Sequence, residues 1–214
     1  MNILQQSIER LSTPVAEGTD AFYRANAQSY FDRTFSLSMD HLYRPFLEAV
    51  GARGRILDVG SGSGRDVKAF RALGYEAFGI EASPELAQLA SSHVGPYFTV
   101  ARVESFVTNE RFDAIWACAS LLHLPRAELY GTIRRLRGLL RPGGVFFATV
   151  QAGTGDLVQA DGRRYTYYSA AEFEDAISES GLQVQRAWES RDVMRPNGPR
   201  WINVIARRGV ESTN

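Results

Sequence analysis

The pattern of apolar and polar positions changes near residue 55 of the chain. Before this point, residues 1–50 carry apolar side chains at helical spacing, with interruptions. After it, short runs rich in β-branched and aromatic residues alternate with longer amphipathic segments. Five runs read as strands, at residues 55–59, 75–80, 96–100, 111–119 and 143–150. Strands that alternate with helices predict a mostly parallel sheet.

Helical periodicity fills the gaps between these strands. We expect helices at 64–74, 83–93, 126–140 and 169–181. Two further alternating runs, 182–190 and 200–208, predict an antiparallel pair of strands at one edge of the sheet. The whole pattern predicts an α/β fold: a doubly wound, mostly parallel, seven-stranded Rossmann-like sheet with an antiparallel edge strand and helices on both faces.

Composition removes several classes of function. The 214 residues are 44% hydrophobic and 22% charged, and the formal net charge is zero, so we expect neither nucleic acid nor a membrane surface as a partner. Cys118 is the single cysteine, which excludes an internal disulfide and a cysteine-cluster metal site. We expect no metal ion. The first residues lack a basic start followed by an apolar block, so we expect a cytoplasmic protein. The sequence leaves the oligomeric state open.

A glycine-rich loop directly follows the first strand. In "RILDVGSGSGRD", residues 55–66, the glycines are Gly60, Gly62 and Gly64. Glycine allows positive φ and lets a ligand touch the backbone, and the helix that follows offers free N–H groups to the same space. Ligands of doubly wound sheets bind past the carboxyl ends of the strands. The loop is therefore a predicted ligand site.

Spacing and nearby acids indicate which ligand the loop suits. A phosphate-binding P-loop needs a lysine that is missing here, and the third glycine comes one residue too early for the dinucleotide fingerprint. Asp58 precedes the loop, where a carboxylate would repel a pyrophosphate but would suit a positive charge. Glu81 ends the second strand, where an acid can bind ribose hydroxyls. This combination describes S-adenosylmethionine. A nicotinamide-dependent oxidoreductase and a non-catalytic cofactor-binding protein of the same fold remain alternatives.

Four segments carry a family resemblance. "ILDVGSGSGRD", "GIEASPELAQLA", "FDAIWACASLLHLP" and "LRPGG" resemble class I S-adenosylmethionine-dependent methyltransferases, and among them the small bacterial tellurite-resistance-type and other small-molecule enzymes. The resemblance implies S-adenosylmethionine as cofactor and methyl transfer to a small-molecule acceptor by in-line displacement. It also implies a helical cap over the cofactor site at residues 1–50, the methyltransferase domain at 51–208 and a tail at 209–214.

The resemblance also implies roles for individual residues. Tyr23 and Tyr30 would close over the cofactor, and the end of the fourth strand, which includes Cys118, would lie near the reactive methyl group. The remaining cofactor-binding residues divide by the part that they would hold: Asp58, Gly60, Ser61, Gly62 and Gly64 the methionine moiety, Glu81 the ribose, and Ala82, Val103 and Glu104 the adenine.

His123 is the candidate general base, because it follows the fourth strand at the functional edge and an unperturbed imidazole titrates near neutral pH. Packing in the apolar "LLHLP" segment is the alternative role for this side chain. Residues 161–169 are expected to help cover the site, and the arginines of 191–200 could form a rim for an anionic group. The chain lacks the Asn/Asp-Pro-Pro-aromatic motif with which related enzymes grip a flipped base, so a nucleic-acid acceptor is not expected.

Overall fold

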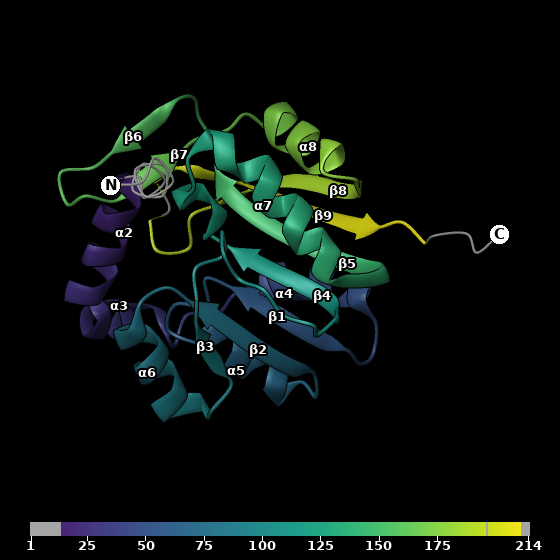
Figure 1. Ribbon diagram of the computed structural model, residues 1–214, viewed down its shortest axis with the longest axis horizontal. Helices are drawn as coiled ribbons and strands as arrows, with labels where there is room; N and C mark the ends of the chain where they lie inside the picture. Colours follow the sequence, from purple (N-terminus) through teal and green to yellow (C-terminus); the bar gives the residue numbers. More distant parts are fainter. Residues whose placement is uncertain (1–13, 196, 211–214) are drawn as a thin grey trace, which may run out of the picture.

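The computed structural model describes residues 14–195 and 197–210, and Figure 1 shows a central sheet with helices on both faces. Residues 1–13 of the expected cap and residues 211–214 of the expected tail lie outside the described residues. The division into cap, domain and tail therefore stays a prediction.

Seven strands form the main sheet in the order β3-β2-β1-β4-β5-β9-β8. β9 alone runs opposite to the other six strands of this sheet, so the predicted doubly wound sheet and its antiparallel pair of strands at one edge are confirmed. Within that pair, β8 is the outermost strand. The strands are β1 (Arg55–Val59), β2 (Glu76–Glu81), β3 (Phe98–Val100), β4 (Phe112–Cys118), β5 (Leu140–Gln151), β8 (Leu182–Arg191) and β9 (Arg200–Arg208).

Helices bury the apolar positions of alternate strand residues on each face. On one face, α4 (Asp40–Val50) and α5 (Arg65–Ala72) cover a cluster in which the Trp116 and Phe147 rings stack at 4.1 Å. On the other, α7 (Arg126–Leu139) and α8 (Ala170–Glu179) cover the larger cluster. Because the central strands are covered on both sides, their sequences are nearly continuous apolar runs.

Three helices stand at the β3 side and near the strand ends: α2 (Pro14–Ala25), α3 (Ala27–Thr34) and α6 (Pro84–Val94) (Figure 1). Ser83 caps α6 as expected, since its hydroxyl accepts from the Leu86 N–H. A short 3₁₀ turn, η1 (Leu121–His123), follows β4.

Two features differ from the expectation. The fifth strand begins at Leu140 instead of residue 143, because the "RPGG" segment stays within β5 and the ladder to β4 shifts register between Phe112 and Ala114. A second, two-stranded sheet of β6 (Asp156–Val158) and β7 (Arg164–Thr166) was not expected. This hairpin contacts α2 and η1, so it stands at the same edge as the glycine loop.

Candidate functional site

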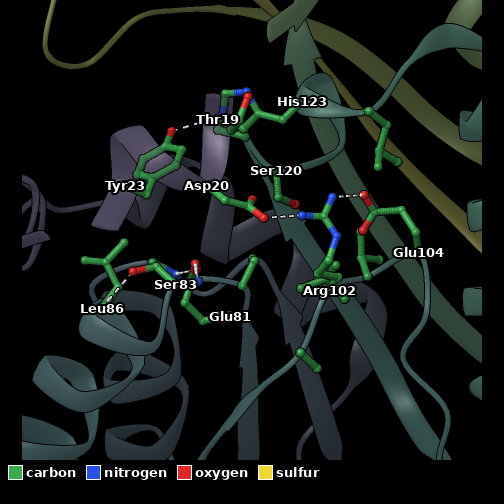
Figure 2. Close-up of a pocket in the computed structure, with 18 of the residues that line it drawn as sticks. Thr19, Asp20, Tyr23, Glu81, Ser83, Leu86, Arg102, Glu104, Ser120 and His123 are labelled. Atoms are coloured by element: carbon green, nitrogen blue, oxygen red, sulfur yellow. Dashed lines mark hydrogen bonds and ion pairs between the residues drawn. The ribbon is translucent and has the colours of Figure 1, made fainter. Parts of the chain in front are cut away.

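A pocket opens past the carboxyl ends of β1, β2 and β4, between β1 and β4 where the strand order reverses. The empty space in and around it is about 820 Å³, which includes open solvent. Figure 2 shows side chains from α2, from the loops after β2 and β3, and from the segment after β4 turned toward this space. The lining residues are Thr19, Asp20, Tyr23, Tyr30, Val59, Gly60, Gly62, Glu81, Ala82, Ser83, Leu86, Ala101, Arg102, Val103, Glu104, Cys118, Ala119, Ser120, His123 and Leu124.

The glycine loop presents bare backbone to the pocket at two positions. Gly60 and Gly62 line it, with φ of 70° and 53°. A Cβ on Gly60 would lie 2.5 Å from the Cβ of Ser120, and one on Gly62 would lie 3.1 Å from the Tyr30 ring. Gly64 is also in the left-handed region, but a Cβ there would meet Ala90 at 2.8 Å, away from the pocket. Two glycines therefore open the site and the third allows α6 to pack.

The Glu81 carboxylate is held rigidly at the end of β2. Its Oε2 accepts from the Gly62 N–H at 2.8 Å and its Oε1 from the Ser83 N–H at 2.8 Å. Burial raises the pKa of Glu81, and these backbone N–H groups act in the opposite direction. Each carboxylate oxygen has a further lone pair, so the fixed group can accept two hydrogen bonds from a diol in the pocket.

Asp58 lies behind the glycine loop and does not line the pocket. Only 1% of the residue is exposed, and its Oδ2 has no hydrogen-bond partner among the described residues. Burial, followed by the neighbouring Asp66 carboxylate, raises the pKa of Asp58 well above its ordinary value. A cation close to a buried carboxyl of this kind favours its charged form and lowers its pKa. Ser61, whose buried Oγ also has no partner among the described residues, lies outside the pocket lining too.

A chain of ion pairs crosses the pocket beside α2. Arg102 bonds to Asp20 of α2 through one guanidinium nitrogen and to Glu104 through another, the latter at 2.6 Å (Figure 2). The structure thus brings the expected Val103 and Glu104 to the pocket. It adds Asp20 and Arg102, for which the sequence gives no motif.

The two N-terminal tyrosines and His123 meet on the α2 side of the pocket. The Tyr23 ring packs edge-on against Tyr30, with centroids 5.2 Å apart. The Tyr23 hydroxyl lies 3.0 Å from Nε2 of His123, whose Nδ1 lies 2.7 Å from the carbonyl oxygen of Arg164 in β7. Burial lowers the pKa of His123 to about 4, so its imidazole is neutral at pH 7.

The segment after β4 forms the wall of the pocket behind the glycine loop. Cys118 lines it, and burial raises the pKa of its thiol, which stays protonated. Ala119 has a φ of 55°, unusual for a residue with a side chain and frequent at functional sites. The Ser120 Oγ is buried without a partner among the described residues, which leaves it available to a ligand.

The arginine-rich segment lies outside this site. Arg195 pairs with Asp192 at 3.5 Å and Arg200 with Glu189 at 2.5 Å, and neither lines the pocket. The segment 161–169 does not line the pocket either, but it contacts His123 through the Arg164 carbonyl and through the Tyr165 ring, which lies 5.1 Å from the His123 ring.

Fold and site together define an α/β protein with a pocket at its topological switch point. The methyltransferase domain family matches residues 31–187. The chain therefore belongs to this family, and its resemblance to class I S-adenosylmethionine-dependent methyltransferases is confirmed.

Curated relatives cover part of the chain. The ubiquinone biosynthesis O-methyltransferase of Xanthomonas campestris pv. campestris is 31% identical over 138 residues, which are 58% of this chain and 57% of that protein. The protein of the same name from Xanthomonas axonopodis pv. citri is 34% identical over 108 residues, 47% of this chain and 44% of that protein. The chain thus spans little more than half the length of the first of these relatives.

Solved structures share the fold. A Burkholderia thailandensis 1,6-didemethyltoxoflavin-N1-methyltransferase, with bound 1,6-didemethyltoxoflavin and S-adenosylhomocysteine, matches with a TM-score of 0.69 at 23% identity, over 88% of each chain. The [4+2]-cyclase SpnF matches with a TM-score of 0.65 at 19% identity, over 85% of this chain and 86% of its own. Since the fold also occurs in a cyclase, the fold alone does not fix the reaction.

Proposed function

We propose that this chain is an enzyme that transfers a methyl group from S-adenosylmethionine to a small-molecule acceptor. The observation that carries the proposal is the buried Glu81 carboxylate, which two backbone N–H groups hold at the pocket wall with lone pairs free for a ribose diol. The partnerless Oδ2 of Asp58 beside the glycine loop fits a ligand with a positive charge. Membership of the methyltransferase domain family supports the transfer reaction.

The residues of the pocket fit this cofactor. When bound, S-adenosylmethionine supplies an electrophilic methyl group. Glu81 would hold the ribose, Ala82, Val103 and Glu104 would border the adenine, and Tyr23, Tyr30 and Cys118 would flank the methionine end. Gly60 and Gly62 would offer backbone contacts, with Asp58 behind them, whereas Ser61 and Gly64 shape the loop from outside the pocket.

The main task of the remaining residues is to position the acceptor. In-line displacement requires the attacking atom about 3 Å from the methyl carbon, and positioning of this kind can supply roughly 7–11 kcal/mol of the barrier. Ser120 and His123 lie on the pocket wall past β4. His123 is the proposed base of the reaction.

The test is calorimetric titration with S-adenosylhomocysteine and, separately, with NADH. Micromolar binding of the first alone is expected. Glu81→Ala should weaken this binding at least tenfold, because hydrogen bonds to a charged group contribute about 1.5–3 kcal/mol each. Glu76→Ala is the matched control: it removes a carboxylate from the same strand at its far end, where 54% of the side chain is exposed.

Other outcomes would favour the alternatives. Binding of NADH would support a nicotinamide-dependent oxidoreductase. Binding of S-adenosylhomocysteine without methyl transfer to any acceptor would support a non-catalytic cofactor-binding protein. Equal affinity of wild type and Glu81→Ala would remove the ribose assignment.

The acceptor and the location of the protein belong to the same proposal. We infer a small molecule and not nucleic acid, because residues 117–120 at the end of β4 lack the proline-aromatic motif that grips a flipped base. A free thiol at Cys118 suits a reducing, cytoplasmic compartment. Within residues 14–195 and 197–210, no helix is long and apolar enough to cross a membrane.

A further inference from the structure

Tyr23, His123 and the Arg164 carbonyl form a continuous hydrogen-bonded chain into the pocket. The Tyr23 hydroxyl is 3.0 Å from Nε2 of His123, and Nδ1 is 2.7 Å from the Arg164 oxygen. The three groups come from α2, η1 and β7, so the chain exists only when the N-terminal helix and the hairpin are both in place. Tyr23 and His123 line the pocket.

The chemistry of the end group fixes the proton positions along this chain. A carbonyl oxygen can only accept, so Nδ1 of His123 carries the proton and donates it to Arg164. In a neutral imidazole Nε2 then has only a lone pair, and the Tyr23 hydroxyl must donate to it. The tyrosine oxygen keeps its own lone pairs, with which it can accept a hydrogen bond from a ligand.

The Arg164 carbonyl is itself held in place. The backbone N–H of Arg164 donates to Thr19 Oγ1 of α2 at 3.0 Å, and Arg164 pairs with Val158 across the hairpin. A fixed carbonyl fixes the tautomer and the ring orientation of His123. Both ring nitrogens are therefore engaged, and an acceptor in the pocket meets the Tyr23 oxygen before it can meet the imidazole.

We propose that Tyr23 and His123 form a two-step proton relay in which Tyr23 contacts the attacking atom, and that the acceptor therefore carries a hydroxyl or an N–H group. This inference rests on the proposed methyltransferase function. In the relay, Tyr23 and not His123 contacts the acceptor. The relay also excludes nucleophiles without a proton to lose, such as tertiary amines and thioethers, as the natural substrate class.

The relay balances. The attacking oxygen or nitrogen uses a lone pair to bond to the methyl carbon, while the electron pair of the broken carbon–sulfur bond stays on sulfur. The proton of the acceptor moves to the Tyr23 oxygen, and the original Tyr23 proton moves to Nε2 of His123. The result is a neutral phenol and an imidazolium, which releases its proton to solvent once the product has left.

The decisive experiment is nitrogen NMR of histidine-labelled protein saturated with S-adenosylhomocysteine. The chain has three histidines, so His123 can be assigned with a single substitution, His123→Gln. We expect the Nδ1-protonated tautomer at His123. Tyr23→Phe, measured at saturating S-adenosylhomocysteine, should move the Nε2 resonance toward that of an unbonded nitrogen.

A matched control removes another hydroxyl close to the same ring. Tyr165→Phe takes away a phenol oxygen that bonds to Arg163 and is no part of the relay, although its ring lies 5.1 Å from that of His123. This variant should leave the Nε2 resonance nearly unchanged. An Nε2-protonated His123, or an Nε2 resonance that Tyr23→Phe does not move, would overturn the relay.

Turnover provides the second measurement, with phenols and primary amines compared with trialkylamines and thioethers as acceptors. Tyr23→Phe should slow transfer to the phenols and amines that wild type methylates by about 100-fold or more, the usual contribution of acid–base catalysis. Equal rates in wild type and Tyr23→Phe, or transfer to a trialkylamine, would contradict the proposal. Failure of wild type to bind S-adenosylhomocysteine would instead contradict the proposed function, which separates the two.

Discussion

Gly64 and Gly60 share one motif and one backbone conformation but serve different purposes. The backbone of Gly60 lines the pocket, whereas the backbone of Gly64 lies against the side chains of Ala90 and Phe98. A motif of alternate glycines is thus half a ligand site and half a packing contact.

Gly64→Ala should destabilise the fold more than Gly74→Ala. Both residues have positive φ, 78° and 90°, but a Cβ at Gly74 meets nothing within 4 Å, whereas one at Gly64 meets Ala90 and Phe98 at 2.8 Å. The left-handed backbone costs about 1–2 kcal/mol in either variant. Overpacking adds roughly 1–3 kcal/mol at Gly64 alone. Urea unfolding measures the difference, and equal midpoints for the two variants would contradict the packing role.

The sequence predicts those site residues that belong to a motif or to the end of a predicted strand. Gly60, Gly62 and Glu81 belong to strand ends whose spacing can be read directly, and all three line the pocket. Asp20 and Arg102 could not be predicted, because their ion pair joins residues 82 positions apart and neither belongs to a motif. Long-range pairs of this kind depend on how helices cross the sheet edge.

At the scale of elements, α2 forms one side of the pocket, and the β6–β7 hairpin packs against α2. The two pack backbone to backbone: a Cβ on Gly18 would lie 2.6 Å from the carbonyl oxygen of Gly162. The guanidinium of Arg163 also lies 4.0 Å from the centre of the Phe22 ring. The position of α2 over the site thus depends on a glycine that no motif marks.

Gly18→Ala should loosen α2 from the hairpin even though alanine favours helices. The new methyl group collides with Gly162, so the amide protons of α2 should exchange at least tenfold faster and S-adenosylhomocysteine should bind more weakly. Gly131→Ala in α7 is the control, because its nearest atom is 3.9 Å away. It should stabilise the protein by about 0.5–1 kcal/mol. Unchanged exchange in Gly18→Ala would show that α2 is held by other contacts.

The β6–β7 hairpin is the part of the fold that the sequence pattern did not predict. Its strands, Asp156–Val158 and Arg164–Thr166, have three residues each, too few for an alternating pattern to appear. The longer parallel strands and the longer helices were found because each is amphipathic or apolar along its full length, and the three-residue β3 was found because it lies within the longer run 96–100. The cover of the site was expected over 161–169, but its strand pairing depends on contacts with α2 and η1.

For the whole molecule, the buried His123 links stability to pH. The pKa of His123 is lowered to about 4 in the folded protein and is about 6.5 in an unfolded chain. Between these values the unfolded chain binds a proton that the folded protein does not. The free energy of unfolding therefore rises with pH through this window, and it falls as the pH drops from about 6.5 to about 4.

This effect should disappear in His123→Gln. Between pH 7 and pH 4 the wild type should lose up to about 3 kcal/mol more stability than the variant, since each pKa unit corresponds to about 1.36 kcal/mol. Urea unfolding at pH 7, 5.5 and 4 measures the two slopes. The comparison cancels the buried acids, which both proteins share. Parallel slopes would show that the imidazole is free to take up a proton in the folded state.

The sheet order has a consequence for protein synthesis. β9 lies between β5 and β8, although it follows β8 along the chain. A nascent chain that has reached residue 199 already contains β8, but the only strand that β8 pairs with in the sheet has not yet been made. Ribosomes add about 5–20 residues per second, so β8 stays unpaired until β9 has been made. A stop between β8 and β9 therefore removes two strands from the sheet instead of one.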